Sequence, residues 1–296
     1  MTTLVFGANG QVGQELLRAL ARHGPLLATT RSGRLPDGSA CEIADFDQPQ
    51  TLSALLDRLQ PTAVVNAAAY TAVDRAEQER DAAFRANAKA PGTIARWCAD
   101  HDVPLVHYST DYVFDGRAQH PYLPNAPTNP LSVYGESKLA GEQEIRVAGG
   151  RHLIFRTAWV YAAHGHNFLR TMLRVGAERD ELRVVADQVG TPTPAALIAD
   201  VTAHVMTQKG RRSGTWHLTA MGETSWHGFA STIFAKAFDL GLIDKLPSVI
   251  PITTSEYPTP APRPAFSRLD TTSLITDWGV ELPQWQQGIE SVLRSL

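Results

Sequence analysis

The sequence predicts an α/β protein: a Rossmann-like, doubly wound parallel sheet with a smaller C-terminal α/β lobe. Three observations lead to this prediction. A glycine-rich turn follows the first apolar run, short apolar runs alternate with helical patterns to about residue 157, and prolines then cluster where this alternation becomes irregular. Strands that alternate with helices form parallel sheets covered on both faces. We expect residues 1–160 to form the main domain and residues 161–296 mainly a smaller lobe interleaved with it.

The composition limits the classes of function. A chain of 296 residues with 43% hydrophobic residues has ample length for a large core. A net charge of −3 provides no basic field, so we expect no nucleic-acid partner. The two cysteines, Cys41 and Cys98, are too few for a disulfide framework and fit a cytoplasmic protein. The N-terminus shows neither an export signal nor a membrane span, and we expect neither.

The chain begins with a strand over residues 4–6, followed by a turn with three glycines and a helix that carries Leu16, Leu17 and Leu20. Gly7 would permit the tight turn, Gly10 would let backbone amides approach a pyrophosphate, and Gly13 would let the helix pack on the strand. The alternative is a glycine turn with a structural role alone. We expect the following residues to bind a dinucleotide: Gly7, Gly10, Gln11, Val12 and Gly13.

The second strand, residues 26–30, bears on the choice of dinucleotide. Sites that prefer NAD usually place an acid after this strand, where it holds the ribose 2′-hydroxyl. This chain has Thr30 and Arg31 there instead, and an arginine with a hydroxyl suits a 2′-phosphate. We therefore expect NADPH to be preferred over NADH. The alternative is that Arg31 is a solvated loop residue.

The next runs extend the sheet. A strand over residues 41–46 ends in Asp45 and Phe46, which could flank an adenine, and a helix follows over residues 51–59. The fourth strand, residues 63–66, leads into small side chains that leave room for a planar group at the carboxyl edge of the sheet, where ligands lie. We expect four more residues to line the cofactor site: Ala67, Ala68, Ala69 and Tyr70.

The candidate catalytic residues follow a long helix over about residues 81–101 and a fifth apolar run over residues 103–106. The hydroxyl pair Ser109-Thr110 comes after this run, and Tyr134 and Lys138 follow on the next helix. Residues four apart lie one turn above each other on one helix face. A nearby ammonium favours the phenolate, so we expect Lys138 to lower the pKa of Tyr134 and make it an acid–base group. The alternative is an ordinary surface tyrosine and lysine.

The remaining chain is less regular. The helix that carries Lys138 should end at Gly149 and Gly150, and a sixth strand covers residues 153–157. A loop containing Trp159 then reaches Asn167, and the later prolines lie at residues 192, 194 and 258–264.

Several motifs together resemble the extended short-chain dehydrogenase/reductases, and more narrowly the dTDP-4-dehydrorhamnose reductase family. The motifs occur in the family's order and spacing over essentially the whole chain: GANGQVG, VNAAAYTAVD, HYSTDYVFDG, PLSVYGESKLAGE, RTAWVY, DQVGTPT and YPTPAPRP. The resemblance implies NAD(P)H-dependent reduction of the 4-keto group of dTDP-4-dehydro-β-L-rhamnose, a dTDP-linked 4-keto-6-deoxy sugar, in the last step of dTDP-rhamnose biosynthesis. The alternative within the superfamily is a reductase of another nucleotide-linked 4-keto sugar. The resemblance also implies that residues 1–160 bind NAD(P) and that the smaller lobe binds the nucleotide sugar.

The resemblance implies a role for each matching residue. Tyr134 would donate a proton to the alkoxide, Lys138 would lower the Tyr134 pKa and hold the nicotinamide ribose, and Thr110 would bond to the keto oxygen. Further positions match residues on the substrate side of the family: Thr71, Val73, Asp111, Trp159 and Asn167. For Trp159, the alternative from the residues alone is a core aromatic after a strand.

One departure from the family concerns assembly. Some members form dimers around a metal held by glutamates, and this chain keeps Glu15 but has Ala196 and Ser295 at the other two positions. One carboxylate per subunit gives a divalent cation too few oxygen ligands. We therefore expect no metal site, and a monomer or a weak homodimer.

Three other functions can be compared with this one. A 4,6-dehydratase would need an acid at the position of Tyr112, which disfavours that reaction. An epimerase would retain tightly bound dinucleotide on purification. A non-catalytic binding subunit would be expected to lack Tyr134, Lys138 or the hydroxyl pair, and all are present.

Overall fold

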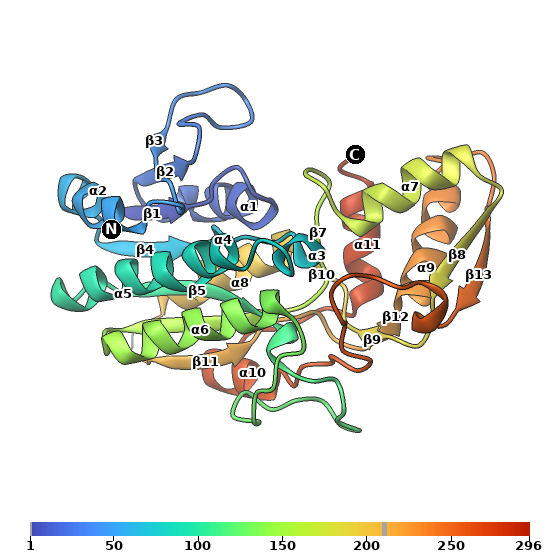
Figure 1. Cartoon of the computed structure of the whole chain (residues 1–296). Coiled ribbons are helices and arrows are strands. Elements are labelled where there is room, and N and C mark those ends of the chain that lie inside the picture. Colours follow the sequence, from blue (N-terminus) through green and yellow to red (C-terminus); the bar gives the residue numbers. More distant parts are fainter. Residues whose placement is uncertain (1, 209–211) are drawn as a thin grey trace.

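A seven-stranded parallel sheet forms the centre of the larger part of the molecule, in the order β11-β6-β5-β4-β1-β2-β3 (Figure 1). The computed structural model describes residues 2–208 and 212–296. Its sheet confirms the predicted fold class. The strands are β1 (Thr3–Phe6), β2 (Leu26–Thr30), β3 (Glu42–Ile43), β4 (Ala63–Asn66), β5 (Leu105–Thr110), β6 (His152–Thr157) and β11 (Gly214–His217).

Helices cover both faces of this sheet (Figure 1). Helices α1 and α8 pack together with α10 on one face, and α2, α5 and α6 cover the other. Strands β1 and β4 are buried along their full length because both faces are covered. These helices are α1 (Gln11–Leu20), α2 (Leu52–Leu59), α5 (Ala90–Asp100), α6 (Val133–Ala148), α8 (Ala195–Thr207) and α10 (Thr272–Trp278).

A smaller lobe lies beyond the carboxyl ends of the strands (Figure 1). Helices α7, α9 and α11 pack against one another around Phe229, and the parallel pair β8–β13 lies on α9. The lobe contains β7 (Val160–Tyr161), α7 (Phe168–Glu178), β8 (Glu181–Val185), β9 (Val189–Gly190), β10 (Thr193–Pro194), β12 (Thr224–Ser225), α9 (Trp226–Asp239), β13 (Ser248–Ile252), η5 (Thr254–Glu256) and α11 (Trp285–Leu293).

The chain crosses between the two parts more than once. After residue 160 it builds most of the smaller lobe, but α8, β11 and α10 return to the sheet. None of the described helices is long and apolar enough to cross a membrane.

Two predicted elements differ from the structure. The strand expected over residues 41–46 shortens to β3, since the Asp45 carboxylate accepts a hydrogen bond from the Asp47 amide at 3.0 Å and turns the chain into η2 (Pro49–Thr51). The helix expected over residues 81–101 consists of α4 (Arg80–Phe84), the π-helix η3 (Arg85–Lys89) and α5. Pro91 lacks the N–H that would bond to the Asn87 carbonyl, which favours a wider turn at this point.

Helix α6 is anchored to the sheet by an ion pair that is fully buried. Glu142 accepts two hydrogen bonds from Arg156 on β6, at 2.8 and 2.7 Å, and a third from the half-exposed Arg146 at 2.7 Å. The bidentate pair with Arg156 holds the pKa of the Glu142 carboxyl below its usual value although burial acts to raise it.

Substituting Glu142 tests this anchor. We expect Glu142→Ala to lower the free energy of unfolding by about 3–5 kcal/mol, because Arg156 would stay buried without its counter-charge. The measurement is the urea unfolding curve of each variant. Glu144→Ala is the control, since Glu144 pairs with Arg96 on the exposed face of the same helix and should cost less than about 1 kcal/mol. Equal losses in the two variants would contradict a structural role for the buried pair.

Candidate active site

The glycine turn between β1 and α1 forms a bare backbone cradle. Gly7 has a φ of +74°, and a Cβ there would lie 2.6 Å from the Ala68 amide nitrogen. A Cβ on Gly13 would lie 2.1 Å from the Gly7 carbonyl oxygen, so the helix could not pack so close with any other residue. Gly10 caps α1 without a side-chain hydrogen bond, which leaves the first-turn N–H groups available to an anion.

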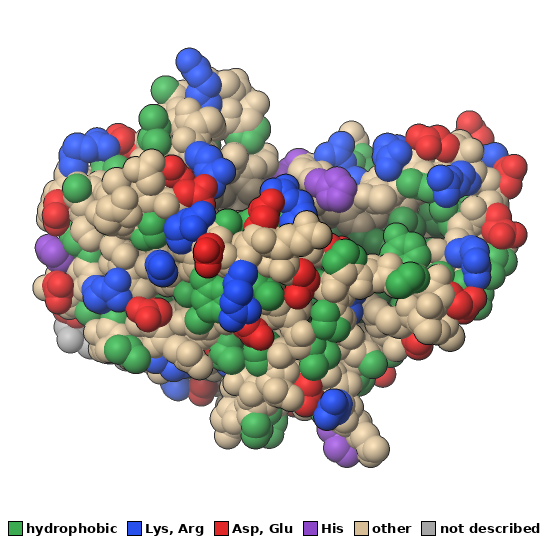
Figure 2. Space-filling view, viewed as in Figure 1, with side chains coloured by type: hydrophobic (Ala, Val, Ile, Leu, Met, Phe, Trp, Pro, Cys, Tyr) green, Lys and Arg blue, Asp and Glu red, His purple; other side chains and the backbone are tan. Residues whose placement is uncertain are grey.

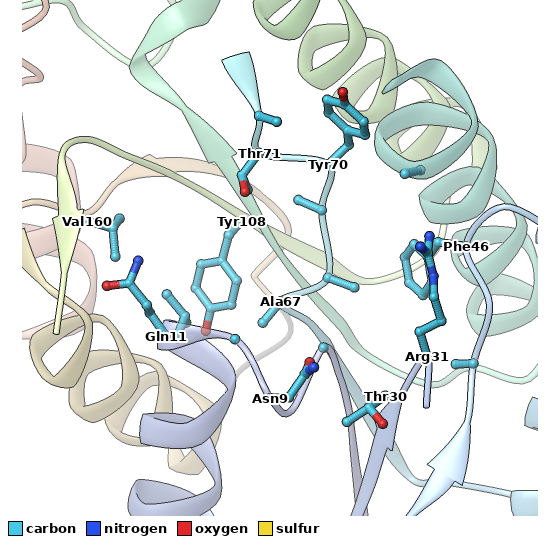
Figure 3. A pocket seen from close by; sticks show the side chains of 18 of the residues that line it. Asn9, Gln11, Thr30, Arg31, Phe46, Ala67, Tyr70, Thr71, Tyr108 and Val160 are labelled. Carbon is cyan, nitrogen blue, oxygen red and sulfur yellow. The ribbon is translucent and has the colours of Figure 1, made fainter. Parts of the chain in front are cut away.

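A cavity of about 590 Å³ opens beside this turn, at the carboxyl edge of the sheet (Figure 3). This volume is in the range of small-molecule sites. Most of the predicted cofactor residues line it: Gly7, Gly10, Gln11, Val12, Thr30, Arg31, Phe46, Ala67, Ala68, Ala69, Tyr70 and Tyr134. Gly13, Asp45 and Lys138 do not line it.

One end of the cavity carries charge. Arg31 and Phe46 lie together there in Figure 3, away from Gln11 and Val160 at the other end. The Arg31 guanidinium donates to Asp47 at 2.8 Å and lies 3.6 Å from Asp45. Asp45 therefore shapes the turn and holds Arg31, and the cavity wall itself is formed by Phe46 and Asp47.

The predicted acid–base pair lies at the other end. Ser132 caps α6 by accepting a hydrogen bond from the Gly135 amide, and the half-buried Tyr134 one residue into the helix lines the cavity. Lys138 lies one turn further on the same helix, is 3% exposed, and donates from Nζ to the Tyr108 carbonyl at 2.6 Å.

The structure does not show the lowered Tyr134 pKa that we expected from Lys138. Burial raises the pKa of Tyr134 to about 12, against the opposing effect of its hydrogen bond with Thr110. Burial also lowers the pKa of Lys138 to about 8, and the charge of Glu142 opposes that shift. Burial outweighs the hydrogen bond with Thr110, and the charge of Asp111 also raises the pKa of Tyr134, so both favour the protonated phenol.

The hydroxyls near Tyr134 divide into two groups. Thr110 donates to Asp111 at 3.0 Å and accepts from the Tyr112 amide at 3.2 Å, and burial raises the pKa of Asp111 to about 6. Ser109 and Thr157 line the cavity, and among the described residues the buried Thr157 hydroxyl has no hydrogen-bond partner, whereas the Ser109 hydroxyl lies near Glu142 and helps to lower the pKa of that carboxyl. The Thr157 hydroxyl therefore requires a partner from a ligand or from water. Sequence reasoning named Ser109 only as part of the hydroxyl pair with Thr110 and gave Thr157 no role.

Asn87 in the π-helix is a second feature that the sequence analysis left without a role. Its side chain holds the backbone of Tyr70 with two hydrogen bonds, of 2.8 and 3.0 Å, and donates a third, of 3.0 Å, to Ser137. It thereby fixes the loop on the cavity wall to α6. π-Helical turns often occur at functional sites, but no local sequence signal marks this one beyond Pro91.

A second cavity of about 320 Å³ lies in the smaller lobe. Aromatic and cationic side chains line it, including Phe168, Arg183, Trp226, Tyr257 and Arg263. Tyr257 and Arg263 belong to the YPTPAPRP motif, which the sequence analysis used without assigning roles. Figure 2 shows a notch in the outline of the molecule between the two parts.

Tyr112 lies between the two cavities. Its ring meets that of Tyr134 edge-on, with centroids 5.7 Å apart, and the charge of Arg263 acts on its hydroxyl. Arg263 itself pairs with Asp74 of α3 (Val73–Ala76) at 2.8 Å, a contact that joins the smaller lobe to the larger part.

The predicted substrate residues lie in different places. Thr71 lines the larger cavity, and Val73 lies at the start of α3, outside both cavity walls. Trp159 has a φ of +47° and stacks on Trp226 with centroids 3.6 Å apart, so it supports the wall of the second cavity from behind.

Asn167 is bonded within the protein. It caps α7 by accepting from the Arg170 amide, and its Nδ2 donates to Gln11 at 2.9 Å and to the Ala162 carbonyl. The structure therefore places Asn167 as a link between the glycine turn and the smaller lobe.

Glu15, which matches a metal-holding glutamate of some family members, is also bonded within the protein. Glu15 pairs with Arg18 at 2.8 Å and accepts from His164 at 3.2 Å. Within residues 2–208 and 212–296, no three His, Cys, Asp or Glu side chains group in a way that could hold a metal ion.

The parallel sheet, the glycine cradle and the Tyr134–Lys138 helix beside one cavity define an extended short-chain dehydrogenase/reductase. The family described as RmlD substrate binding domain matches residues 1–296, and the chain belongs to this family. The resemblance found in the sequence motifs is thereby confirmed.

Relatives match along their full length. The dTDP-4-dehydrorhamnose reductase of Burkholderia thailandensis is 45% identical over 305 residues, covering 100% of this chain and 99% of that protein. The enzyme of that name from Escherichia coli K12 is 43% identical, with 100% and 98% covered. Among solved structures, a dTDP-4-dehydrorhamnose reductase from Bacillus anthracis in complex with NADP has a TM-score of 0.90 at 31% identity, with 100% and 99% covered.

Two glycine substitutions separate folding from binding at the cradle. We expect Gly13→Ala to lower the free energy of unfolding by about 1–3 kcal/mol, because its methyl group would overlap the Gly7 carbonyl. Gly10→Ala should fold almost normally, since its Cβ would meet the nearest atom at 3.3 Å, but should weaken dinucleotide binding about tenfold or more. Thermal unfolding and calorimetric titration with NADPH measure the two effects. Normal affinity in Gly10→Ala would contradict the cradle's role.

Proposed function

We propose that this protein reduces the 4-keto group of dTDP-4-dehydro-β-L-rhamnose with NADPH or NADH, giving dTDP-β-L-rhamnose. This is the last step in the biosynthesis of that sugar nucleotide. The observation that carries the proposal is the phenol of Tyr134 at the wall of the larger cavity, with Lys138 one turn further on the same helix and Thr110 nearby. The match to dTDP-4-dehydrorhamnose reductases, at 43–45% identity along the whole chain, supports the substrate class.

The residues of the larger cavity fit a nicotinamide dinucleotide. The glycine cradle accepts a pyrophosphate where a Cβ would collide, and the Thr157 hydroxyl, which has no partner among the described residues, offers a bond to the polar end of a ligand near Tyr134. When bound, a reduced nicotinamide supplies a hydride. We propose that the dinucleotide extends from Arg31 and Phe46 to Tyr134, with Asp45 acting on the adenosine end through Arg31.

The protein's own groups control the charge that develops on the substrate oxygen. Hydride addition to C4 leaves an electron pair on the oxygen, and Tyr134 donates a proton to it. The Thr110 hydroxyl would turn from Asp111 to hold the same oxygen by a hydrogen bond. The Lys138 ammonium is placed one helical turn away, where it stabilises the phenolate left behind. Burial keeps water away from this step and strengthens each of these interactions.

We propose that the second cavity holds the nucleotide part of the substrate. Arg183 and Arg263 provide cations for a diphosphate, and Trp226 with Tyr257 provides apolar faces for a base. Thr71, Val73, Asp111, Trp159 and Asn167 remain the proposed substrate-side residues. Thr71 would face the sugar, Asp111 would act on it from behind Thr110, and the other three would hold the surrounding wall.

The organisation of the chain follows from these sites. We propose that residues 1–160 form the NAD(P)-binding domain and that residues 161–296 mainly form the nucleotide-sugar lobe, with α8, β11 and α10 returning to the first. We propose a monomer or weak homodimer without a bridging metal, because Glu15 is engaged by Arg18 and His164. The free thiols of Cys41 and Cys98 fit a cytoplasmic enzyme.

The activity is tested with a panel of dTDP-linked 4-keto-6-deoxy sugars. Purified protein is mixed with NADPH or NADH, the loss of reduced cofactor is followed, and the product is identified by mass spectrometry and NMR. Turnover of the rhamnose-series ketone supports the proposal, and turnover of another ketone alone would reassign the substrate. Tightly bound NAD in the purified protein, without net oxidation of added cofactor, would indicate an epimerase.

Tyr134→Phe tests the proton donor. We expect kcat to fall by about 10² or more, while the Kd for NADPH stays near that of the wild type, because the variant keeps the ring and loses the acid. Steady-state kinetics and calorimetry measure these two quantities. Tyr122→Phe is the control, since that phenol bonds to Asp115 away from both cavities. Unchanged kcat in Tyr134→Phe would refute the assigned role.

Arg31→Ala tests recognition of the 2′-phosphate. We expect KM for NADPH to rise about tenfold and KM for NADH to change far less, because only NADPH carries the phosphate. Arg34→Ala, in the same loop but outside the cavity wall, serves as the control. Equal changes for the two cofactors would mean that Arg31 does not read the phosphate.

A further inference from the structure

The charged end of the larger cavity contains two acids as well as the arginine expected to bind a 2′-phosphate. Asp47 accepts a hydrogen bond from Arg31 at 2.8 Å, and its other carboxylate oxygen lies 3.9 Å from Arg85. Asp45 lies 3.6 Å from Arg31. Two cations and two anions therefore meet at this corner, and their formal charges cancel.

Arg31 and Asp47 differ from the other two charges in their position. Both line the cavity, whereas Asp45 and Arg85 do not. The Asp45 carboxylate also bonds to the Asp47 amide at 3.0 Å and to Gln48, so it maintains the turn. The contacts of the Asp47 carboxylate are with Arg31 and Arg85. Its charge can therefore be removed without disturbing the turn.

A 2′-phosphate and the Asp47 carboxylate compete for one guanidinium. A phosphate monoester carries about −1.5 to −2 charges near pH 7, so it would be repelled by the carboxylate that already holds Arg31. A ribose 2′-hydroxyl carries no charge and can donate a hydrogen bond to a carboxylate. The same acid thus disfavours NADPH and suits NADH.

We propose that Asp47 is a specificity-determining residue that restrains the preference for NADPH by occupying Arg31 and repelling the 2′-phosphate. This inference rests on the proposed NAD(P)H-dependent function. It differs from the role of Arg31, because it explains how a site with an arginine at this corner can still accept NADH. Asp47 has little structural importance, since an ion pair between such exposed side chains contributes about 0–1 kcal/mol to folding.

Asp47→Asn tests the proposal with NADPH and NADH on the same enzyme preparation. We expect the ratio of kcat/KM for NADPH to kcat/KM for NADH to rise about 5–10-fold, because one unit of positive charge becomes available to the phosphate. Calorimetric titrations with NADP⁺ and NAD⁺ should give the same shift in the ratio of Kd values. The shift should shrink at high ionic strength, since the corner is exposed.

Glu42→Gln is the matched control. Glu42 lies on β3 and pairs with Arg58 at 2.6 Å, outside the cavity wall, so its variant changes the net charge equally without touching the corner. We expect its cofactor ratio to stay within about twofold of the wild type.

The outcomes separate this inference from the proposed function. A rise of less than about threefold in Asp47→Asn, or an equal rise in Glu42→Gln, would overturn the role of Asp47 while wild-type turnover remains. Absence of turnover by the wild type with either cofactor would instead reject the proposed function, and the Kd ratios from calorimetry would still decide the role of Asp47.

Discussion

Helix α6 is fixed on the sheet by an ion pair that water does not reach. Glu142 and Arg156 are both almost completely buried, and separating them would leave a charge in an apolar interior. The pair therefore sets the rotation and height of the helix. Lys138 lies one turn and Tyr134 two turns before Glu142 on the same face, so the position of the phenol at the cavity depends on this contact.

The two parts of the molecule are joined by side-chain contacts around the site. Arg263 pairs with Asp74, and Asn167 donates to Gln11 next to the glycine turn. Tyr112 lies between the cavities, in contact with Tyr134 and under the charge of Arg263. The cofactor site that we propose for the larger part and the substrate site that we propose for the smaller lobe are thereby held in one arrangement around Tyr134.

Local sequence patterns were sufficient for much of the fold. The strands over residues 26–30 and 63–66 match β2 and β4, and α6 ends at Gly149, whose φ of +76° suits glycine. The glycine turn and the Tyr134–Lys138 spacing were also visible, because each depends on residues close together in the chain. The resemblance to one family then supplied roles that composition and periodicity do not contain.

Tertiary contacts decided the rest. The sequence by itself determined the order of strands and helices, the glycine cradle and the pairing of Tyr134 with Lys138 on one helix face. The structure decided that Lys138 bonds to the Tyr108 carbonyl, that burial raises the Tyr134 pKa, and that Arg183 and Arg263 share a cavity. The structure also decided that Asn167 bonds to Gln11 and that Trp159 stacks on Trp226 behind the wall of the second cavity. Burial, hydrogen-bond partners and cavity walls come from segments far apart in the chain, and local patterns carry no record of how those segments meet.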